Sequence, residues 1–468
     1  MQLFTQPQRP DLQEIISSFS FPPTSSGEIM KPPANQLVEL VSKYFPVFEP
    51  YLSLPEQARQ AARIMAICHT SDLGGHVEGC PNGHIERIFY NSCGHRFCPR
   101  CAARIRRKWL IAREAKLFPV RHYHTIFTLP HTFNVLWRYN HQKMGDLLFH
   151  SGVNALKVLL ADPRWLGAET GITAALETWD DRMRFHPHLH CMVTGGGLSP
   201  EGKWIDVANP DCLVAVKPLM YEFRKQFCQG VRQLLKADEL TLPGDTSKRQ
   251  WVARLNKINR KNWAVFIAKQ PEKGGPATKD ILRYLSEDVA GGPLSGDRLV
   301  AQSSEFSAVQ LGYLNSAPLS EDRLQEAREA REGEVSFTWG KYDPVTQKRE
   351  RTEIETLPIE EFLQRYLQHV PPSGYQTIRH YGLYTSAKKT AYEQCAELLL
   401  DRSPLVSSDE TGEELSFDND SWIAEHTCPV CGRPLIVTKH LPSTLTGQII
   451  ERPPLGPVSV QFPVSGTA

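Results

Sequence analysis

The sequence lacks any run of about 18 apolar residues, so it offers no candidate transmembrane helix. Its first residues, MQLFTQPQRPDLQ, also lack the charged and then apolar pattern of a secretion signal. Neither the phosphate-binding loop Gly-x-x-x-x-Gly-Lys-Ser/Thr nor the zinc-hydrolase pattern His-Glu-x-x-His occurs. These absences argue against a membrane protein, a P-loop helicase and a common class of zinc hydrolase, and we expect a cytoplasmic protein.

An excess of charge of one sign is absent too, since 53 Lys and Arg oppose 52 Asp and Glu. The two signs are nevertheless segregated. Nine basic residues and one acid, Glu114, lie between Cys93 and Arg121, and seven basic residues with no acid lie in 248–269. Such runs can form basic faces that follow a phosphate backbone, although a solvated helix face explains them equally well. The candidate DNA-binding residues are Arg104, Arg106, Arg107, Lys108, Lys257, Arg260 and Lys261.

The chain has 468 residues, of which 41% are hydrophobic, and this argues for two or three globular domains of the α+β class. Hydrophobic periodicity and turn residues predict alternating groups of helices and strands. We expect helices over 37–68, 102–117, 141–160, 278–290 and 359–368, strands over 122–129, 172–179, 188–194 and 263–267, and a hairpin over 335–350.

The segment 68–101 is dense in cysteine and histidine, with nine potential metal ligands. Within it, Cys-x-x-x-His precedes Cys-Gly-His-x-x-Cys-x-x-Cys by about the spacing that closes one tetrahedral zinc site. The alternative is a chance grouping of buried thiols. The surroundings are basic and offer no acid–base group, so we expect a structural Zn²⁺ site. The expected ligands are Cys80, Cys93, Cys98 and Cys101, with His84 and His95 in reserve.

A second short-spaced pair, Cys428-Pro-Val-Cys431, is typical of a small zinc knuckle. Its other two ligands stay open from the sequence. His426, Cys395 and His440 are the candidates.

The segment from Glu177 to His190 contains the residues most suited to catalysis. Side chains alternate along a strand, so His188 and His190 point to one face while Leu189 points to the core. If the neighbouring strand pairs back as a hairpin, Glu177 lies beside them. Two imidazoles and one carboxylate can hold a divalent ion with positions left open for water and a phosphate oxygen. Taken alone, His-x-His is equally compatible with a core or surface role.

Several segments resemble the HUH nucleases, which cut single-stranded DNA with a tyrosine. These are Phe127-Thr-Leu-Pro130, His188-Leu-His190 and a tyrosine on a later helix, Tyr284. The chain is more closely similar to the IS91 family of insertion-sequence transposases. That resemblance covers roughly residues 40–435, in the same order. It is carried by Leu73–Val77, Tyr90–Cys101, His124–His131, His186–His190, Gly195–Leu198, Arg283–Leu285, Ile378–Leu383 and the late Cys-x-x-Cys.

The resemblance implies an HUH-type antiparallel sheet with flanking helices, an N-terminal helical zinc-binding domain and a small C-terminal zinc knuckle. The domains it suggests are a disordered segment 1–36, a zinc-binding DNA-recognition domain 37–118, a nuclease domain 119–300, a C-terminal extension 301–437 and a disordered tail 438–468. The implied partner is DNA, as single-stranded or hairpin element ends, in a bacterial cell and near its nucleoid.

The resemblance also implies roles for individual residues. A divalent ion, Mg²⁺ or Mn²⁺, on Glu177, His188 and His190 would orient the scissile phosphate, and Tyr284 would attack it to form a 5′-phosphotyrosine. Two departures stand out: Asp288 replaces the family's second tyrosine, and Glu177 stands where members often carry His. The first departure implies one nucleophile per chain or a contribution from a second subunit. The competing interpretations are a replication initiator or relaxase with the same chemistry, and a non-catalytic zinc-dependent DNA-binding protein.

Overall fold

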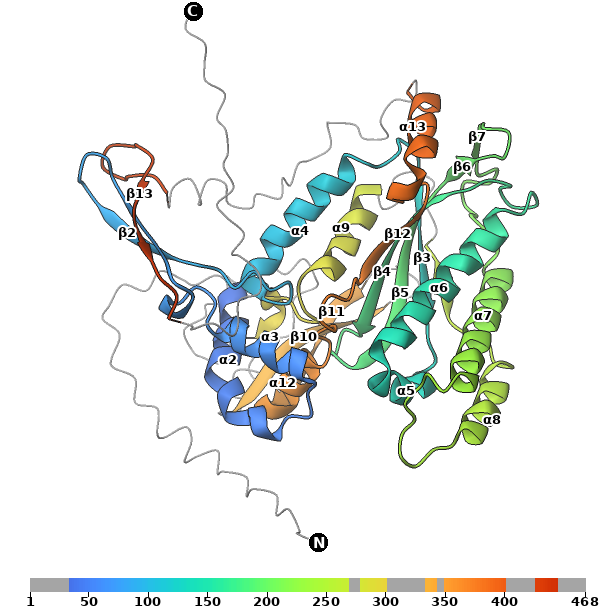
Figure 1. Cartoon of the computed structure of the whole chain (residues 1–468), viewed down its shortest axis with the longest axis horizontal. Helices are drawn as coiled ribbons and strands as arrows, with labels where there is room; N and C mark the ends of the chain where they lie inside the picture. Colours follow the sequence, from blue (N-terminus) through green and yellow to red (C-terminus); the bar gives the residue numbers. More distant parts are fainter. Residues whose placement is uncertain (1–32, 269–277, 301–332, 343–348, 401–425, 445–468) are drawn as a thin grey trace, which may run out of the picture.

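The computed structural model describes residues 33–268, 278–300, 333–342, 349–400 and 426–444 (Figure 1). Most of the expected disordered segment 1–36, most of the expected tail and the turn of the 335–350 hairpin lie outside the described residues. The prediction of disorder is wrong for 33–36, which form the first turn of helix α2 (Pro33–Phe48). In the described part, no helix is long and apolar enough to cross a membrane.

A five-stranded antiparallel sheet forms the centre of the larger half of the molecule. Its order is β12-β4-β5-β3-β8, so β5 is the middle strand and β12, from late in the chain, is an edge strand. The strands are β3 (His122–Thr128), β4 (Gly171–Trp179), β5 (Phe185–Thr194), β8 (Val265–Ile267) and β12 (Ile378–Gly382). The sequence predicted the first four, but it left β12 unassigned in the expected C-terminal extension.

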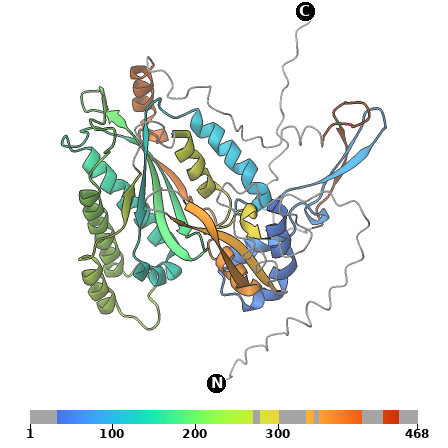
Figure 2. The same cartoon turned by 180° about the vertical axis from the view of Figure 1, so that it is seen from behind.

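One face of this sheet is covered by helices, and the main hydrophobic core lies between them (Figures 1 and 2). Leu189, Cys191 and Val193 point from β5 into this core, as the alternation predicted. The covering helices are α5 (Asn134–Tyr139), α6 (His141–Leu160), α7 (Val216–Lys236) and α8 (Lys248–Ile258). α6 has apolar residues on most of its surface, which suits a helix buried between the sheet and α7.

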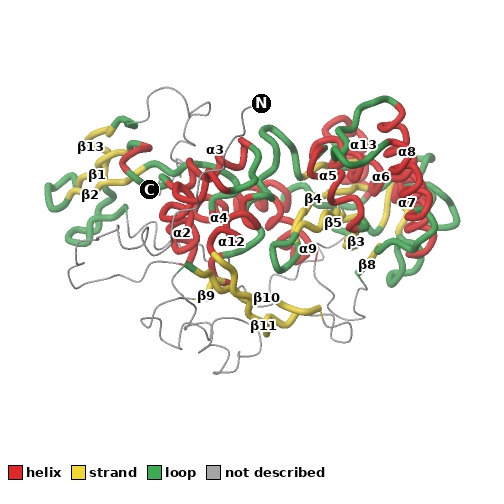
Figure 3. Tube along the Cα trace, turned by 90° about the horizontal axis from the view of Figure 1, so that it is seen from below, coloured by secondary structure: helices red, strands yellow, loops and turns green. Residues whose placement is uncertain are grey.

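The opposite face carries two other helices, α4 (Pro99–Glu114) and α9 (Thr278–Val289), which pack against each other (Figure 3). Leu110 of α4 and Ile281, Leu282 and Leu285 of α9 form a small core with Met192 of β5. Both helices were predicted, with α4 beginning three residues earlier than expected because Pro99 suits the first turn. α4 starts in the cysteine-rich segment and therefore links that segment to the sheet.

A second core gathers the helices of the N-terminal part with a later helix and sheet. It contains α2 (Pro33–Phe48), α3 (Glu56–Ala66) and α12 (Ile359–Leu367), and the three-stranded sheet β11-β10-β9 packs beside them. The strands are β9 (Leu299–Val300), β10 (Glu334–Tyr342) and β11 (Arg349–Pro358). The expected helix 37–68 is thus two helices, since the chain turns between Phe48 and Glu56, where Pro50 and Pro55 interrupt the helical backbone.

A third sheet projects from the rest of the molecule, in the order β13-β1-β2 (Figure 1). It consists of β1 (Gly75–Gly79), β2 (Glu86–Tyr90) and β13 (Ile436–Leu441). The prediction of a tail from residue 438 is wrong for 438–441, because these residues pair with the open edge of β1. The remaining elements are β6 (Gly196–Leu198) with β7 (Trp204–Asp206), and α13 (Lys389–Leu398).

Candidate active site and metal centres

Glu177, His188 and His190 meet on the face of the central sheet that carries α9. In the β4–β5 register, Glu177 lies directly opposite His188, and His190 is two residues further along the same face. The Glu177 Oε2 atom lies 3.3 Å from His188 Nε2 and 3.1 Å from His190 Nε2. The antiparallel hairpin therefore brings together the three residues that the sequence grouped.

These three side chains suit a divalent cation. Their candidate ligand atoms lie within 4.8 Å of one another, and all three side chains are shielded from solvent. Burial alone would raise the pKa of Glu177, but the neighbouring His188 and His190 outweigh burial and lower that pKa. A charged carboxylate beside two imidazoles is the donor set of hard and borderline divalent ions. The residues present thus fit the expected cation.

His124 of β3 adds a member that the sequence analysis did not single out. Its Nε2 lies 2.9 Å from Nδ1 of His190, on the side of that ring away from Glu177. For Nε2 of His190 to bind a cation, Nδ1 of His190 must carry the proton, and this N–H then donates a hydrogen bond to Nε2 of His124. Burial is the main reason that the pKa of His124 falls to about 3, so His124 stays neutral and able to accept. The antiparallel β3–β5 pairing and the alternation along β3 were the signals that could have revealed it.

Tyr284 lies against the same cluster. Its ring centroid is 5.1 Å from that of His190 and 5.4 Å from that of His124. The neighbouring α9 residues Ile281, Leu282 and Leu285 are buried, which holds the helix on the sheet, while Tyr284 remains 40% exposed. The structure therefore brings a solvent-accessible phenol to two imidazoles that lie 94 and 160 residues earlier in the sequence.

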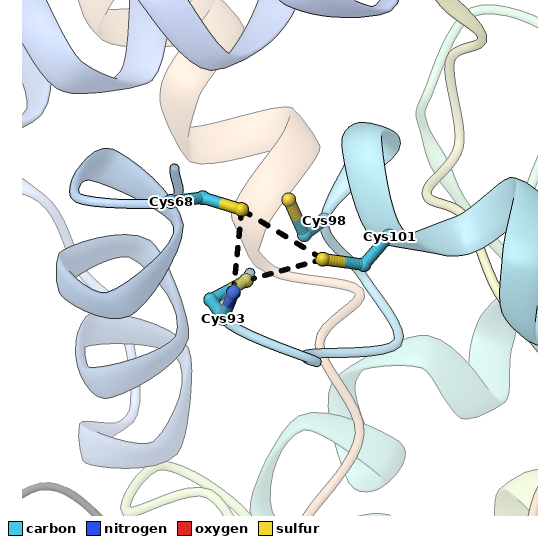
Figure 4. Close-up of side chains that lie close together, drawn as sticks. All are labelled: Cys68, Cys93, Cys98 and Cys101. Carbon is cyan, nitrogen blue, oxygen red and sulfur yellow. Dashed lines mark hydrogen bonds between the residues drawn. The ribbon is translucent and has the colours of Figure 1, made fainter. Parts of the chain in front are cut away.

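Four buried or half-buried thiols form a first cysteine cluster, here called the four-cysteine cluster: Cys68, Cys93, Cys98 and Cys101 (Figure 4). The Sγ atom of Cys101 lies 3.7 Å from that of Cys68 and 3.6 Å from that of Cys93. A tetrahedral zinc with bonds of about 2.3 Å spaces its sulfur ligands about 3.8 Å apart, whereas a disulfide requires about 2 Å. The sulfur spacing fits a Zn²⁺ site and not a disulfide.

A second group joins the two ends of the described chain and is called here the Cys₃His cluster: Cys80, His84, Cys428 and Cys431. The Cys80 Sγ atom lies 3.6 Å from Cys431 Sγ and 3.6 Å from His84 Nδ1. Cys428 Sγ lies 3.7 Å from the same His84 nitrogen. The ligand set is again that of a closed, structural zinc site.

The structure therefore divides the expected zinc ligands differently from the sequence analysis. Cys80 and His84 lie at the turn of the β1–β2 hairpin, whereas Cys68 and Cys93 flank its base. Five residues of strand, at about 3.3 Å each, separate the two ends, which is too far for one ion. Cys68 takes the place that we expected Cys80 to occupy.

Of the two reserve ligands, His84 joins the Cys₃His cluster, whereas His95 and the three candidates named for the knuckle have other contacts. Nδ1 of His95 accepts a hydrogen bond from the backbone N–H of Phe97, and His426 bonds to Glu78. Cys395 is buried in a separate apolar cluster, and His440 is exposed on β13. None of these four residues belongs to a metal-ligand group within the described chain.

The candidate DNA-binding residues fall on two sides of the molecule. Arg104, Arg106, Arg107 and Lys108 lie on α4, on the side of the sheet that carries the Glu177 cluster. Lys257, Arg260 and Lys261 are exposed on or just after α8, which packs against α7 beyond the opposite face. The aromatic residues of the second run, Trp251 and Trp263, are buried core residues and not stacking platforms.

Comparison with known proteins gives two family matches. Residues 40–129 match a family described as "Transposase zinc-binding domain" of the IS91 type, and residues 171–311 and 310–391 match a family described as "Putative transposase". No solved structure matches the chain.

Two relatives extend the match over most of the length. The chain is 31% identical over 408 residues to the "Putative transposase y4qJ" of Sinorhizobium fredii, covering 85% of this chain and 92% of that protein. It is 27% identical over 328 residues, 68% of each protein, to the transposase for insertion sequence element IS801 of Pseudomonas savastanoi pv. phaseolicola. A zinc-binding segment that carries cysteine clusters, followed by a transposase segment that carries the Glu177 cluster, places this chain in the IS91 family of insertion-sequence transposases.

Proposed function

We propose that this transposase cuts and rejoins single-stranded DNA at the ends of its insertion sequence through Tyr284, as an HUH-type nuclease. The observation that carries the proposal is the position of the Tyr284 ring, 5.1 Å from the ring of His190. A nucleophile, a set of cation ligands and an oriented imidazole on one accessible face are the parts that phosphodiester cleavage by a tyrosine needs.

Glu177, His188 and His190 would hold Mg²⁺ or Mn²⁺, and such an ion, when bound, supplies charge that polarises the scissile phosphate. The hydroxyl oxygen of Tyr284 attacks the phosphorus in line and loses its proton. The bond from phosphorus to the 3′ oxygen breaks, and this oxygen takes up a proton to become a 3′-OH. The 5′ side stays linked to Tyr284 as a phosphotyrosine, which conserves the phosphodiester energy, so a 3′-OH can reverse the step without ATP.

Asp288 stands one helical turn after Tyr284, where the resembling enzymes carry a second tyrosine. Each chain then supplies one nucleophile, so a second strand cleavage before release of the first requires a second subunit. The family assignment favours this transposition role over a replication initiator or relaxase. The phenol beside the His190 ring favours an active enzyme over a non-catalytic DNA-binding protein.

The test uses single-stranded oligonucleotides that cover the two ends of the element, labelled at the 3′ end so that the covalent fragment is visible. Wild-type protein with Mn²⁺ should give a labelled adduct on a denaturing gel, and Tyr284→Phe should abolish it, because no oxygen remains to attack. Tyr139→Phe is the matched control, since Tyr139 is 54% exposed on α5, across the sheet. Glu177→Gln should weaken Mn²⁺ binding and reduce adduct formation by at least about tenfold. An adduct that persists in Tyr284→Phe would refute the assignment of the nucleophile.

A further inference from the structure

A large groove lies between α4, β12 and α13, with a volume of about 2200 Å³. This volume is more than twice that of a site for a small molecule, which is typically about 300–1,000 Å³. One wall is a face of α4 that presents Trp109 and Arg113, with Lys116 just after the end of the helix. The other wall includes His380 of β12 and Tyr392 of α13. The Arg104–Lys108 residues singled out from the sequence are not part of the lining.

The groove is basic. Six of its lining residues are Lys or Arg, against the single acid Glu393. Three of the six are paired with carboxylates: Arg63 with Glu49 and Glu56, Arg379 with Asp146 and Lys389 with Glu393. Arg96 donates a hydrogen bond to the hydroxyl of Thr377. Arg113 and Lys116 differ, because neither forms an ion pair with a carboxylate in the described part of the chain.

The guanidinium of Arg113 has an unusual environment. Its Nε atom is buried and has no hydrogen-bond partner among the described residues. Burial lowers the pKa of its guanidinium, and the charges of Arg113 and Lys116 help burial to lower the pKa of His380 to about 4. Arg113 and Lys116 thus lie near each other without a carboxylate partner in the described part of the chain, and the nearby imidazole of His380 stays neutral. An external anion would relieve the repulsion between these two cations and complete the hydrogen bonding of Arg113.

Aromatic side chains are interleaved with these cations. Trp109 lies one helical turn before Arg113, so both project from the same face of α4. Lys116 follows just after the helix ends and also lines the groove. A ligand that suits these groups carries repeated negative charges and flat apolar surfaces. An unpaired nucleic acid strand has both, because its phosphates can meet cations while its bases stack on aromatic rings. The groove also reaches Val289 at the end of α9, the helix that carries Tyr284.

We infer that this groove binds the single-stranded DNA that flanks the cleavage point, with Arg113 and Lys116 on phosphates and Trp109 stacked on a base. The inference rests on the proposed function for the identity of the strand, but the binding itself requires no chemistry at Tyr284. The four-cysteine cluster would support this groove, because Cys93 lines it and Cys98 and Cys101 hold the first turn of α4.

The test is fluorescence anisotropy of a labelled dT20 strand over a range of NaCl concentrations. The double variant Arg113→Ala/Lys116→Ala should bind about tenfold more weakly at 100 mM NaCl, and its log Kd should depend less steeply on log salt, by about 1.4 for two lost phosphate contacts. Trp109→Ala should weaken binding by about fivefold or more, and Trp109→Phe should restore most of the loss.

The matched control is Lys217→Ala/Lys236→Ala, which removes two exposed charges from α7 beyond the opposite face of the sheet. It should leave dT20 affinity within about twofold. Zinc content and circular dichroism establish that each variant is folded. The proposal that the groove binds DNA would be refuted by any of three results. The control could lose as much dT20 affinity as Arg113→Ala/Lys116→Ala, the latter could lose none, or Arg106→Ala/Lys108→Ala could lose more. A 20-base-pair duplex that binds more tightly than dT20 and depends equally on Arg113 and Lys116 would also refute it.

The two proposals fail separately. If wild-type protein forms no adduct but the groove variants lose dT20 affinity, the groove stands and the nucleophile is wrong. If Tyr284→Phe abolishes the adduct while dT20 affinity is the same in every groove variant, the chemistry stands and the groove is wrong.

Discussion

The two cysteine clusters have similar ligands but very different surroundings. The four-cysteine cluster is built from residues 68–101 and is part of the core that contains α2, α3 and α12. The Cys₃His cluster connects residues 351 positions apart, and among the described residues its apolar contacts are Leu435 and Ile85. β2 and β13 beside it are mostly exposed. A metal in the first cluster would reinforce an existing core, whereas a metal in the second would take the place of a core.

The largest expected effect follows from opening the four-cysteine cluster with Cys101→Ser. Zinc content should fall from two ions to one per chain, and the N-terminal half should lose more than about 4 kcal/mol of stability, because buried thiols are left without their ion beside a shared core. Metal analysis and thermal unfolding by circular dichroism measure both changes. An unchanged unfolding midpoint would contradict the view that this cluster supports the core.

A smaller and local effect is expected from Cys428→Ser. Zinc should again fall to one ion per chain, but the main unfolding transition should stay within about 2 °C, because β13 contributes little buried surface. The released strand should become a substrate for trypsin after Lys439, as Arg433 is protected by the following Pro434. Mass spectrometry of the fragments detects the cut, and wild-type protein with zinc is the control. Unfolding of the whole protein in Cys428→Ser would contradict the view that the Cys₃His cluster stabilises only the projecting sheet.

The smallest effect is expected from Cys395→Ser, a buried thiol that belongs to neither cluster. Both zinc ions should remain, and the buried hydroxyl should cost about 1 kcal/mol of stability. Metal analysis beside the two preceding variants provides the comparison. A lost zinc ion would make Cys395 a ligand and would require the Cys₃His cluster to be redrawn.

The difference between the clusters also explains what the sequence could predict. Glu177 and His188 are eleven residues apart in one hairpin, so strand alternation and a single turn were enough to bring them together. Cys80 and Cys431 meet only because β13 returns to β1 from the far end of the chain, and no local pattern carries that information. The short spacing of Cys93, Cys98 and Cys101 was read correctly as one unit, but their fourth partner depends on the length of the intervening hairpin.

The face that a helix presents is a second property that local sequence leaves open. The basic run on α4 was evident, yet periodicity alone does not say whether Arg106 or Arg113 borders the groove. That choice depends on how α4 packs on α9 and on the late strand β12. Likewise, His124 joins His190 only through the pairing of β3 with β5.

The return of β13 to β1 has a consequence for synthesis of the protein on the ribosome. Cys80 and His84 emerge early, but the two thiols that complete their site are translated some 350 residues later. A polypeptide that stops short of residue 431, through a nonsense codon or a broken message, keeps an open strand edge and an incomplete pair of ligands. Until β13 has been synthesised, β1 therefore lacks one of its two strand partners, and Cys80 and His84 lack the other half of their site.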